Sequence, residues 1–414
     1  GATILYVTDA TKDTVSFGGK TGLYNILYSS KGSNLIVRII GDVNVPSGAK
    51  ANDGSSNDGS HMLYMQNMSN VTIEGVGTDA HLVRWGFEIK RSKNIEVRNL
   101  YFYQYPDDAV GITGSDSSRS ERIWIHNNTF GVGKNEYAGN GTVDADKAEG
   151  DGSTDIKWTN YVTISYNHYQ GCHKTSLVGG GTSHLQDWIT YHHNYFDGTE
   201  SRNPRARNAH IHVYNNYFRG NSGYGIGASY NSKIFSEANY FDGSNLPLDT
   251  EAMGNDQYSG TIKSYNDKLV NCKGNSIYTA VNSRTASANI NNLVAGGASY
   301  DNFDINSSLI YLNGYNAQTA DEAKAEVLAY AGRMQNKAYG NGSVNTNPSN
   351  PNEPGNPTTP ETPSSADYVF DSSKLSVASY SSDNKVNSMY TIKVNAADAV
   401  SVANHAATAS DGSF

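Results

Sequence analysis

Short runs of β-branched and aromatic residues recur along this chain, and their spacing constrains the fold more than any other feature. Seven such runs begin at residues 71, 95, 123, 162, 189, 211 and 234, at intervals of 24, 28, 39, 27, 22 and 23 residues. Alternation within each run is typical of a strand, and recurrence at about 22 to 24 residues is typical of a solenoid. We therefore predict an all-β fold, a right-handed parallel β-helix with three short strands and three turns in each coil.

Five of the runs share a second pattern, an asparagine five residues after the start and an aromatic residue two positions later. The asparagines are Asn128, Asn167, Asn194, Asn216 and Asn239, and the aromatic residues are Phe130, Tyr169, Phe196, Phe218 and Phe241. Because each coil pairs with its neighbours, we expect the apolar side chains to stack inward and the asparagines to form a ladder at a turn.

The longer intervals between runs indicate where loops leave the solenoid. Extra residues in a coil become loops on one face, which is often the binding face. The 28-residue interval contains Pro106–Ala109, the 39-residue interval contains Asp144–Asp155, and the 27-residue interval contains Lys174. Charged residues therefore gather where the repeat is interrupted, and the arginine-rich segment Ser201–Arg207 follows directly.

The sequence after the repeats predicts a helix, a linker and an accessory segment. Thr319–Glu322 has the form of a capping box, which predicts a helix to about Ala331 that closes the end of the solenoid. Prolines at every third position from 348 to 363 predict an extended linker over residues 341–365. We expect a solenoid domain at 1–340 and a partial, β-rich accessory segment at 366–414, for which a disordered tail is the alternative.

Composition and cysteine count narrow the class of protein. A net charge of −9 argues against nucleic-acid binding, and no apolar run is long enough for a membrane span. Cys172 and Cys272 are compatible with one disulfide or two thiols. The first residues read as a strand, as in a trimmed mature chain. Four histidines lie within strand runs, where packing is expected rather than zinc binding: His192, His193, His210 and His212.

Three aspartates in the enlarged coils are candidate metal ligands. Asp108 lies in the first of these coils, and Asp151 and Asp155 lie four residues apart just before the next strand run. Carboxylates from adjacent coils can converge on Ca²⁺, which prefers oxygen ligands and tolerates irregular geometry. We expect an open calcium site. We expect Asp107 to cap a turn beside it, with a secondary calcium contact as the alternative.

Cationic side chains that accompany these aspartates in the sequence predict an anionic ligand and a reaction at the carbon next to its carboxylate. Lys174, Arg202, Arg205 and Arg207 offer an ammonium and three guanidinium groups, which bind planar anions such as carboxylates. A polyanion carboxylate neutralised by metal and cations acidifies the proton on its adjacent carbon. A base can then remove that proton, and a β-leaving group departs without water.

At this point the chain resembles a known family, the pectate lyases of polysaccharide lyase family 1, over about residues 1–340. Four segments carry the resemblance, in the family's order: Asp107–Val110, Asp151–Lys157, Gly171–Leu177 and Arg202–Arg207. The resemblance implies that Asp108, Asp151 and Asp155 bind Ca²⁺. It implies that Lys174 and Arg207 bind substrate, that Arg202 is the base, and that Arg205 is a further contact.

The activity implied is calcium-dependent cleavage of (1→4)-α-D-galacturonan by β-elimination, giving 4,5-unsaturated products. Arg202 would remove the C5 proton, although a guanidinium is normally protonated, so a carboxylate clamp with hydroxide or water as base is the alternative. The resemblance also implies a secreted, monomeric bacterial enzyme that acts on polygalacturonate or pectin in plant cell walls. Carbohydrate binding is one expectation for residues 366–414.

One segment departs from the family pattern. The family's Trp-Ile-Asp-His reads here Trp124-Ile125-His126-Asn127, so the side chains that support the metal site from behind are expected to differ.

Three other functions stay open. A pectin lyase would act without calcium on methyl-esterified polymer, a polygalacturonase would use an acid and a base carboxylate around a water, and a pectin-binding solenoid would show no turnover.

Overall fold

The computed structural model describes residues 1–29, 34–49, 62–179, 184–250, 256, 259–274, 283–284, 286, 299–306 and 317–333. These residues belong to one compact unit, Gly1–Arg333. The predicted linker at 341–365 and the accessory segment at 366–414 lie outside the described residues, as does the predicted boundary at residue 340.

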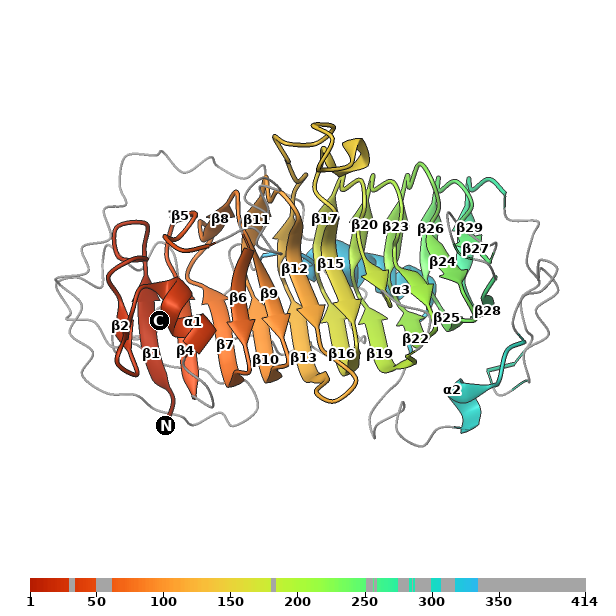
Figure 1. Cartoon of the computed structure of the whole chain (residues 1–414). Helices are drawn as coiled ribbons and strands as arrows, with labels where there is room; N and C mark the ends of the chain where they lie inside the picture. Colours follow the sequence, from red (N-terminus) through yellow and green to blue (C-terminus); the bar gives the residue numbers. More distant parts are fainter. Residues whose placement is uncertain are drawn as a thin grey trace, which may run out of the picture. The chain divides into compact units, whose positions relative to one another are not determined.

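The unit is a right-handed parallel β-helix built from three long sheets (Figure 1). In each sheet every strand pairs with the strand three further along the chain, so each complete coil contributes one strand to each sheet. The ten-stranded sheet contains β1 (Thr3–Val7), β4 (Leu35–Ile39), β7 (Ser69–Gly75), β10 (Lys93–Arg98), β13 (Ser120–His126), β16 (Thr159–Ser165), β19 (Gln186–His192), β22 (Ala209–Tyr214), β25 (Lys233–Glu237) and β28 (Thr261–Tyr265).

The other two sheets have shorter strands. The nine-stranded sheet contains β5 (Asp42–Asn44), β8 (His81–Val83), β11 (Tyr101–Tyr103), β14 (Thr129–Phe130), β17 (His168–Gln170), β20 (Tyr195–Asp197), β23 (Tyr217–Arg219), β26 (Tyr240–Asp242) and β29 (Lys268–Val270). The eight-stranded sheet contains β6 (Met62–Gln66), β9 (Gly86–Lys90), β12 (Asp108–Thr113), β15 (Gly152–Lys157), β18 (Leu177–Val178), β21 (Arg205–Arg207), β24 (Ile226–Ser229) and β27 (Leu248–Asp249). A small antiparallel pair, β2 (Ser16–Phe17) and β3 (Lys20–Thr21), lies near the first coil.

The predicted register is confirmed residue by residue. All seven predicted runs lie in the ten-stranded sheet, and their first residues pair directly with one another in a continuous column. The pairs are Val71 with Ile95, Ile95 with Ile123, Ile123 with Val162, Val162 with Ile189, Ile189 with Ile211, and Ile211 with Ile234. Equivalent apolar side chains therefore stack inside the solenoid.

Both predicted ladders are present. The asparagine side chains are buried, and each donates from Nδ2 to Oδ1 of the next: Asn128 to Asn167 at 3.1 Å, Asn167 to Asn194 at 3.1 Å, Asn194 to Asn216 at 2.9 Å and Asn216 to Asn239 at 3.0 Å. The ladder ends on Asp267, which accepts from Asn239 at 3.0 Å. The aromatic rings stack with centroids 4.4–5.0 Å apart: Phe130, Tyr169, Phe196, Phe218 and Phe241.

Within the described residues, three α-helices accompany the coils. The first, α1 (Leu23–Ser29), buries Leu23, Ile26 and Leu27 in the main core, and α2 is a single turn (Phe303–Asn306). The predicted capping box is confirmed at α3 (Ala320–Tyr330), where Thr319 and Glu322 bond reciprocally.

The prediction that this last helix closes the end of the solenoid is wrong. Helix α3 lies along the flank of the nine-stranded sheet, where Ala320 and Val327 pack among Tyr195, Tyr217 and Tyr240 of three successive coils. A capping box fixes where a helix begins and does not determine which surface the helix covers.

The structure describes the two cysteines and the four histidines whose roles could not be decided from sequence spacing. Cys172 and Cys272 are free thiols, with Cys172 buried. The four histidines stack on aromatic rings, as expected for packing: His192 on Tyr214, His193 on Tyr166, His210 on Phe303 and His212 on Phe235.

His210 also makes two ion pairs. Its Nδ1 lies 3.4 Å from Asp187 and its Nε2 lies 2.9 Å from Asp301. Although burial lowers the pKa of His210, these carboxylates raise it to about 9. The histidine therefore carries a positive charge at neutral pH.

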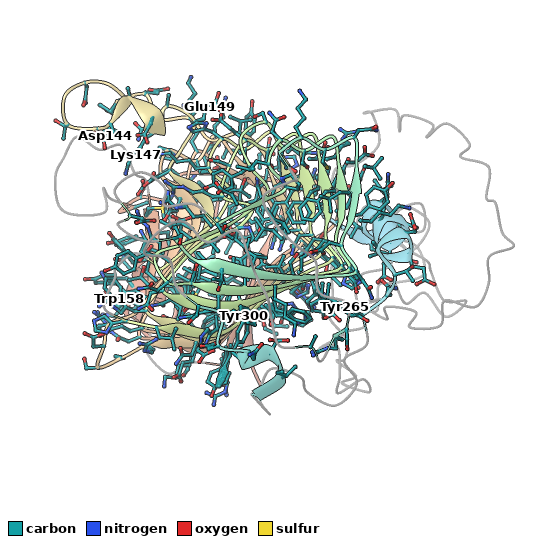
Figure 2. The ribbon with its side chains drawn as sticks, turned by 90° about the vertical axis from the view of Figure 1, so that its right-hand side faces the viewer. Asp144, Lys147, Glu149, Trp158, Tyr265 and Tyr300 are labelled. Carbon is teal, nitrogen blue, oxygen red and sulfur yellow. The ribbon has the colours of Figure 1, made fainter. Side chains whose placement is uncertain are left out.

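The prediction that the 39-residue interval forms a loop is confirmed. Residues 131–151, between β14 and β15, project beyond the sheets (Figure 1) and contain the 3₁₀ turn η1 (Ala145–Lys147). In the end-on view, Asp144, Lys147 and Glu149 lie in this loop at one corner of the coil, whereas Trp158 lies at another corner (Figure 2).

Candidate active site

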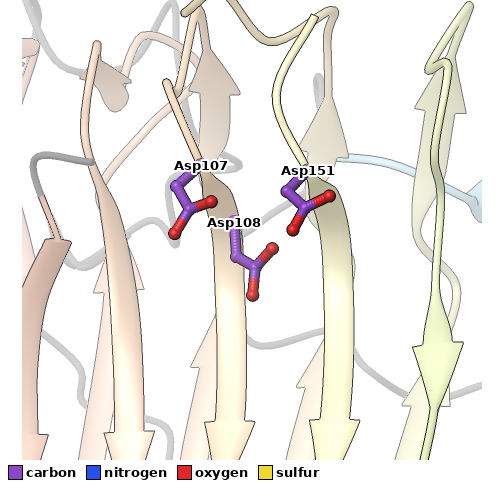
Figure 3. Close-up of side chains that lie close together, drawn as sticks. All are labelled: Asp107, Asp108 and Asp151. Carbon is purple, nitrogen blue, oxygen red and sulfur yellow. The ribbon is translucent and has the colours of Figure 1, made fainter. Parts of the chain in front are cut away.

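The register of two neighbouring strands brings three carboxylates together. Asp108 opens β12 and pairs with Gly152, which opens β15, so Asp107 and Asp151 precede adjacent strands side by side. One carboxylate oxygen from each of Asp107, Asp108 and Asp151 lies within 4.8 Å of the others (Figure 3). Within the described part of the chain this is the only group of at least three such side chains that could hold a metal.

Asp155 lies further along β15, outside that group but close to it. Its Oδ1 accepts a hydrogen bond from the Leu177 backbone N–H at 2.9 Å. Glycine is required at position 152 because a Cβ there would lie only 2.3 Å from Asp155 Oδ1. The sequence therefore places Asp155 beside the acidic group, and a backbone donor from the next coil fixes its orientation.

The carboxylates in this region repel one another, and Lys157 offsets part of that repulsion by lowering the pKa of Asp108 and Asp155. Burial raises the pKa of Asp108 well above its usual range, and the neighbouring Asp155 and Asp107 raise it further. Burial also raises the pKa of Asp155. Oxygen donors on buried, mutually repelling carboxylates are the ligands that a hard divalent cation such as Ca²⁺ prefers. The residues present fit such an ion.

Two lysines contact the outer carboxylate of the group. Lys174, with only 8% of its side chain exposed, places Nζ 3.1 Å from Asp151 Oδ1 and 2.6 Å from Asp146 Oδ2. Lys147 Nζ lies 2.9 Å from Asp151 Oδ2 and 3.7 Å from Asp107 Oδ1. Although burial raises the pKa of Asp151, these two ammonium groups outweigh it and lower the pKa to about 2.

The predicted base lies at the same place. Lys174 and Ser201 form a β-bridge between adjacent coils, so Arg202 follows directly beside the lysine. Arg202 Nη1 lies 3.4 Å from the backbone carbonyl oxygen of Asp151. Asp151 therefore joins the acidic group, the predicted substrate lysine and the predicted base.

The other two arginines share one carboxylate that the sequence did not reveal. Asp256, whose side chain is 4% exposed, lies 2.6 Å from Arg205 Nη2 and 2.8 Å from Arg207 Nη2, and it accepts from Arg207 Nε at 3.1 Å. Arg205 also reaches the neighbouring coil, with Nε 3.3 Å from Ser229 Oγ. Asp256 thus orients both guanidinium groups.

Two sequence interpretations of this region can be compared with the structure. The carboxylate of Asp107 belongs to the acidic group, because residues that precede paired strands meet at one edge, and this position is compatible with the alternative of a secondary calcium contact. The departure at His126 does not lie behind the acidic group. His126 belongs to the ten-stranded sheet, where it contacts Glu96 at 2.9 Å and stacks beneath Trp124.

Fold and site together define a class of protein, a β-solenoid with a carboxylate cluster bordered by lysine and arginine. A family model described as pectate lyase matches residues 25–337, and the chain belongs to this family. Among curated relatives, a pectate trisaccharide-lyase of Bacillus licheniformis is 32% identical over 225 residues, covering 53% of this chain and 61% of the relative. Pectate lyase E of Dickeya chrysanthemi is 31% identical over 272 residues, covering 60% and 69%. The chain thus spans about three-fifths of the first relative's length.

Solved structures share the fold. A pectate lyase from Bacillus sp. N165, in complex with trigalacturonate, has a TM-score of 0.56 at 24% identity and covers 80% of this chain and 94% of its own. Pectate lyase C from Erwinia chrysanthemi, solved with Ca²⁺, has a TM-score of 0.53 at 20% identity, with coverage of 80% and 93%.

Proposed function

We propose that this protein is a calcium-dependent pectate lyase that cleaves (1→4)-α-D-galacturonan by β-elimination to 4,5-unsaturated oligogalacturonides. The observation that carries the proposal is the position of Asp151. Its carboxylate joins the acidic group, its side chain contacts Lys174 at 3.1 Å, and its carbonyl oxygen lies 3.4 Å from Arg202. A lyase of this kind needs a cation site, a carboxylate receptor and a base within reach of one sugar.

In this proposal Asp108, Asp151 and Asp155 hold Ca²⁺, and Asp107 is a further oxygen donor. When bound, Ca²⁺ would neutralise charge on the substrate carboxylate and so acidify the C5 proton. Lys174 and Arg207 bind galacturonate carboxylates, and Arg205 supports Arg207 through their shared partner Asp256.

The base in the proposal is Arg202, which in its neutral form removes the C5 proton. The electron pair left at C5 forms the C4–C5 double bond as the C4–O bond breaks, and the departing glycosidic oxygen takes a proton from solvent. The buried surroundings of Lys174 and Asp155 limit the access of water, which suits elimination rather than hydrolysis.

A pectin lyase is the second candidate, since it would use the same fold on methyl-esterified polymer. It would have no use for a buried acidic group, because an uncharged methyl ester needs no metal ion to bridge it to protein carboxylates. The acidic group therefore favours the pectate lyase over the pectin lyase.

One assay separates these functions. Polygalacturonate is incubated with the protein and Ca²⁺, and the ultraviolet absorbance of the conjugated product is followed. We expect turnover that excess EDTA abolishes and added Ca²⁺ restores. Asp151→Asn should lose most activity, whereas Asp116→Asn, which changes an exposed aspartate outside the site, should keep it. Full turnover in EDTA would favour the pectin lyase, and reducing ends without ultraviolet absorbance would favour a hydrolase.

We also propose that the enzyme is secreted and acts as a monomer on polygalacturonate or pectin. In the described part of the chain no helix is long and apolar enough to cross a membrane. Size-exclusion chromatography with light scattering would test the monomer, and a dimer mass would contradict it.

A further inference from the structure

The turn Ala145–Lys147 presents two adjacent, oppositely charged side chains to the candidate active site. Asp146 Oδ2 lies 2.6 Å from Lys174 Nζ, the group proposed to bind a substrate carboxylate. The next residue, Lys147, places Nζ 2.9 Å from Asp151 and 3.7 Å from Asp107, two carboxylates of the acidic group. A carboxylate thus occupies the anion receptor, and an ammonium occupies the edge of the cation site.

We propose that the Asp146–Lys147 pair is an autoinhibitory plug, in which Asp146 stands in for a galacturonate carboxylate and Lys147 for part of the Ca²⁺ charge. The proposal rests on the function proposed above and adds a means of regulation to the same site. Binding of Ca²⁺ and substrate displaces the turn, so the two ligands help each other to bind.

Charge and geometry require the displacement of Lys147. Ca²⁺ binds carboxylate oxygens at about 2.3–2.6 Å. An ion held by Asp107 and Asp151 would therefore lie within a few ångströms of Lys147 Nζ, which contacts the same two carboxylates. Like charges at that separation repel strongly in a partly buried site.

The anion receptor is blocked in the same way. Lys174 has three ammonium hydrogens, and two of them point to Asp146 and Asp151. Only 8% of the Lys174 side chain is exposed, so a substrate carboxylate that binds Lys174 would compete with Asp146 for it. Asp146 itself is 60% exposed and loses little by turning to water.

Exposed side-chain contacts hold the turn Ala145–Lys147 at the site. None of its residues is buried, and the Asp144 side chain forms no capping hydrogen bond. Among the polar contacts of the described residues, the side chains of Asp146 and Lys147 reach the body of the solenoid only through the ion pairs above. Release of either residue therefore weakens the hold of the other.

The test compares two plug variants with two controls in the same loop. Lys147→Met and Asp146→Asn remove the plug charges. Lys134→Met and Asp144→Asn make the same changes at side chains outside the site, since Lys134 pairs only weakly with Glu136 at 3.7 Å. Lys147→Arg keeps the positive charge. Calorimetry of Ca²⁺ binding without substrate, and KM for polygalacturonate, are measured for each.

We expect Lys147→Met to tighten Ca²⁺ binding by about fivefold or more, the scale of a partly exposed ion pair. Asp146→Asn should lower KM by a similar factor with kcat nearly unchanged. Lys147→Arg and both controls should match the wild type. Unchanged or weaker Ca²⁺ binding by Lys147→Met, or an equal gain in Lys134→Met, would overturn the plug.

Failure of the plug is distinguishable from failure of the proposed function. Wild-type protein that binds Ca²⁺ and cleaves polygalacturonate, with plug variants that behave identically, rejects the plug alone. Wild-type protein that neither binds Ca²⁺ nor cleaves polygalacturonate rejects both.

Discussion

Asp256 is predicted to position Arg205 and Arg207, the arginines proposed to bind substrate, and its replacement by asparagine tests that role. The carboxylate is 4% exposed and contacts Arg205, Arg207 and the Ser229 hydroxyl, at 2.5–3.1 Å. Asp256→Asn keeps the shape but removes the negative charge, leaving two guanidinium groups side by side. Breaking a buried ion pair costs about 3–5 kcal/mol. Because Arg207 is 24% exposed and can reach water, we expect a loss near the lower value, about 3 kcal/mol in the free energy of unfolding.

The effect on function follows from the geometry of Arg207. Asp256 holds one edge of its guanidinium through Nε and Nη2, which turns the remaining donors toward a ligand. A charged hydrogen bond contributes about 1.5–3 kcal/mol. Losing most of one bond to substrate predicts a rise in KM of roughly tenfold, with kcat changed much less.

Urea titration and initial rates on polygalacturonate measure the two effects. The matched control is Asp197→Asn, which breaks an arginine–carboxylate pair with Arg219 on the nine-stranded sheet. Arg219 is 57% exposed, so its pair is worth at most about 1 kcal/mol, and KM should not change. An unchanged KM for Asp256→Asn, or a rise that Asp197→Asn reproduces, would refute the positioning role.

Three further predictions concern the ladder, the histidine and the base. Asn194→Ala should lower the free energy of unfolding by about 3 kcal/mol in urea titrations, because it leaves the buried Asn167 N–H without its acceptor; a loss below about 1 kcal/mol would contradict this. The pKa of His210 is raised to about 9, so its stabilisation is complete below pH 6.5 and disappears as pH rises through 9. The wild type should therefore exceed the His210→Gln variant in free energy of unfolding by less and less as pH rises from 6.5 to 9, a change of as much as about 3 kcal/mol. A difference that stays constant with pH would be inconsistent with an ion pair between His210 and Asp301. Arg202→Lys should lower kcat by roughly 10² or more with little change in KM, whereas a clamp would mainly raise KM.

The repeat could be predicted from the sequence because its signals are local and recur. Each run carries its own alternation, and the asparagine and aromatic residues stand at fixed offsets within it. Stacking such runs in one register is the only arrangement that buries every equivalent position, so Ile123 pairs with Ile95 and Val162 as expected. The capping box at Thr319 is equally local, and it is confirmed.

The contacts that could not be predicted are those made by loops. Asp256 and Arg205 are 51 residues apart in sequence, and no repeat offset relates them. Lys147 stands four residues before Asp151 in an irregular loop, where spacing does not fix direction. Helix α3 shows the same limit, since its start follows from the sequence and its docking on Tyr217 and Tyr240 does not.

The position of the site follows from how a solenoid uses its strands. Asp108 pairs with Gly152 although a 21-residue loop separates β14 from β15, because strand register is set by inward-facing side chains rather than by loop length. The loop can therefore be long without moving Asp107 and Asp151 apart, and it carries Asp146 and Lys147. The proposed cation site and the proposed plug can coexist on one coil because different forces position them, burial in the strands and exposed ion pairs in the loop.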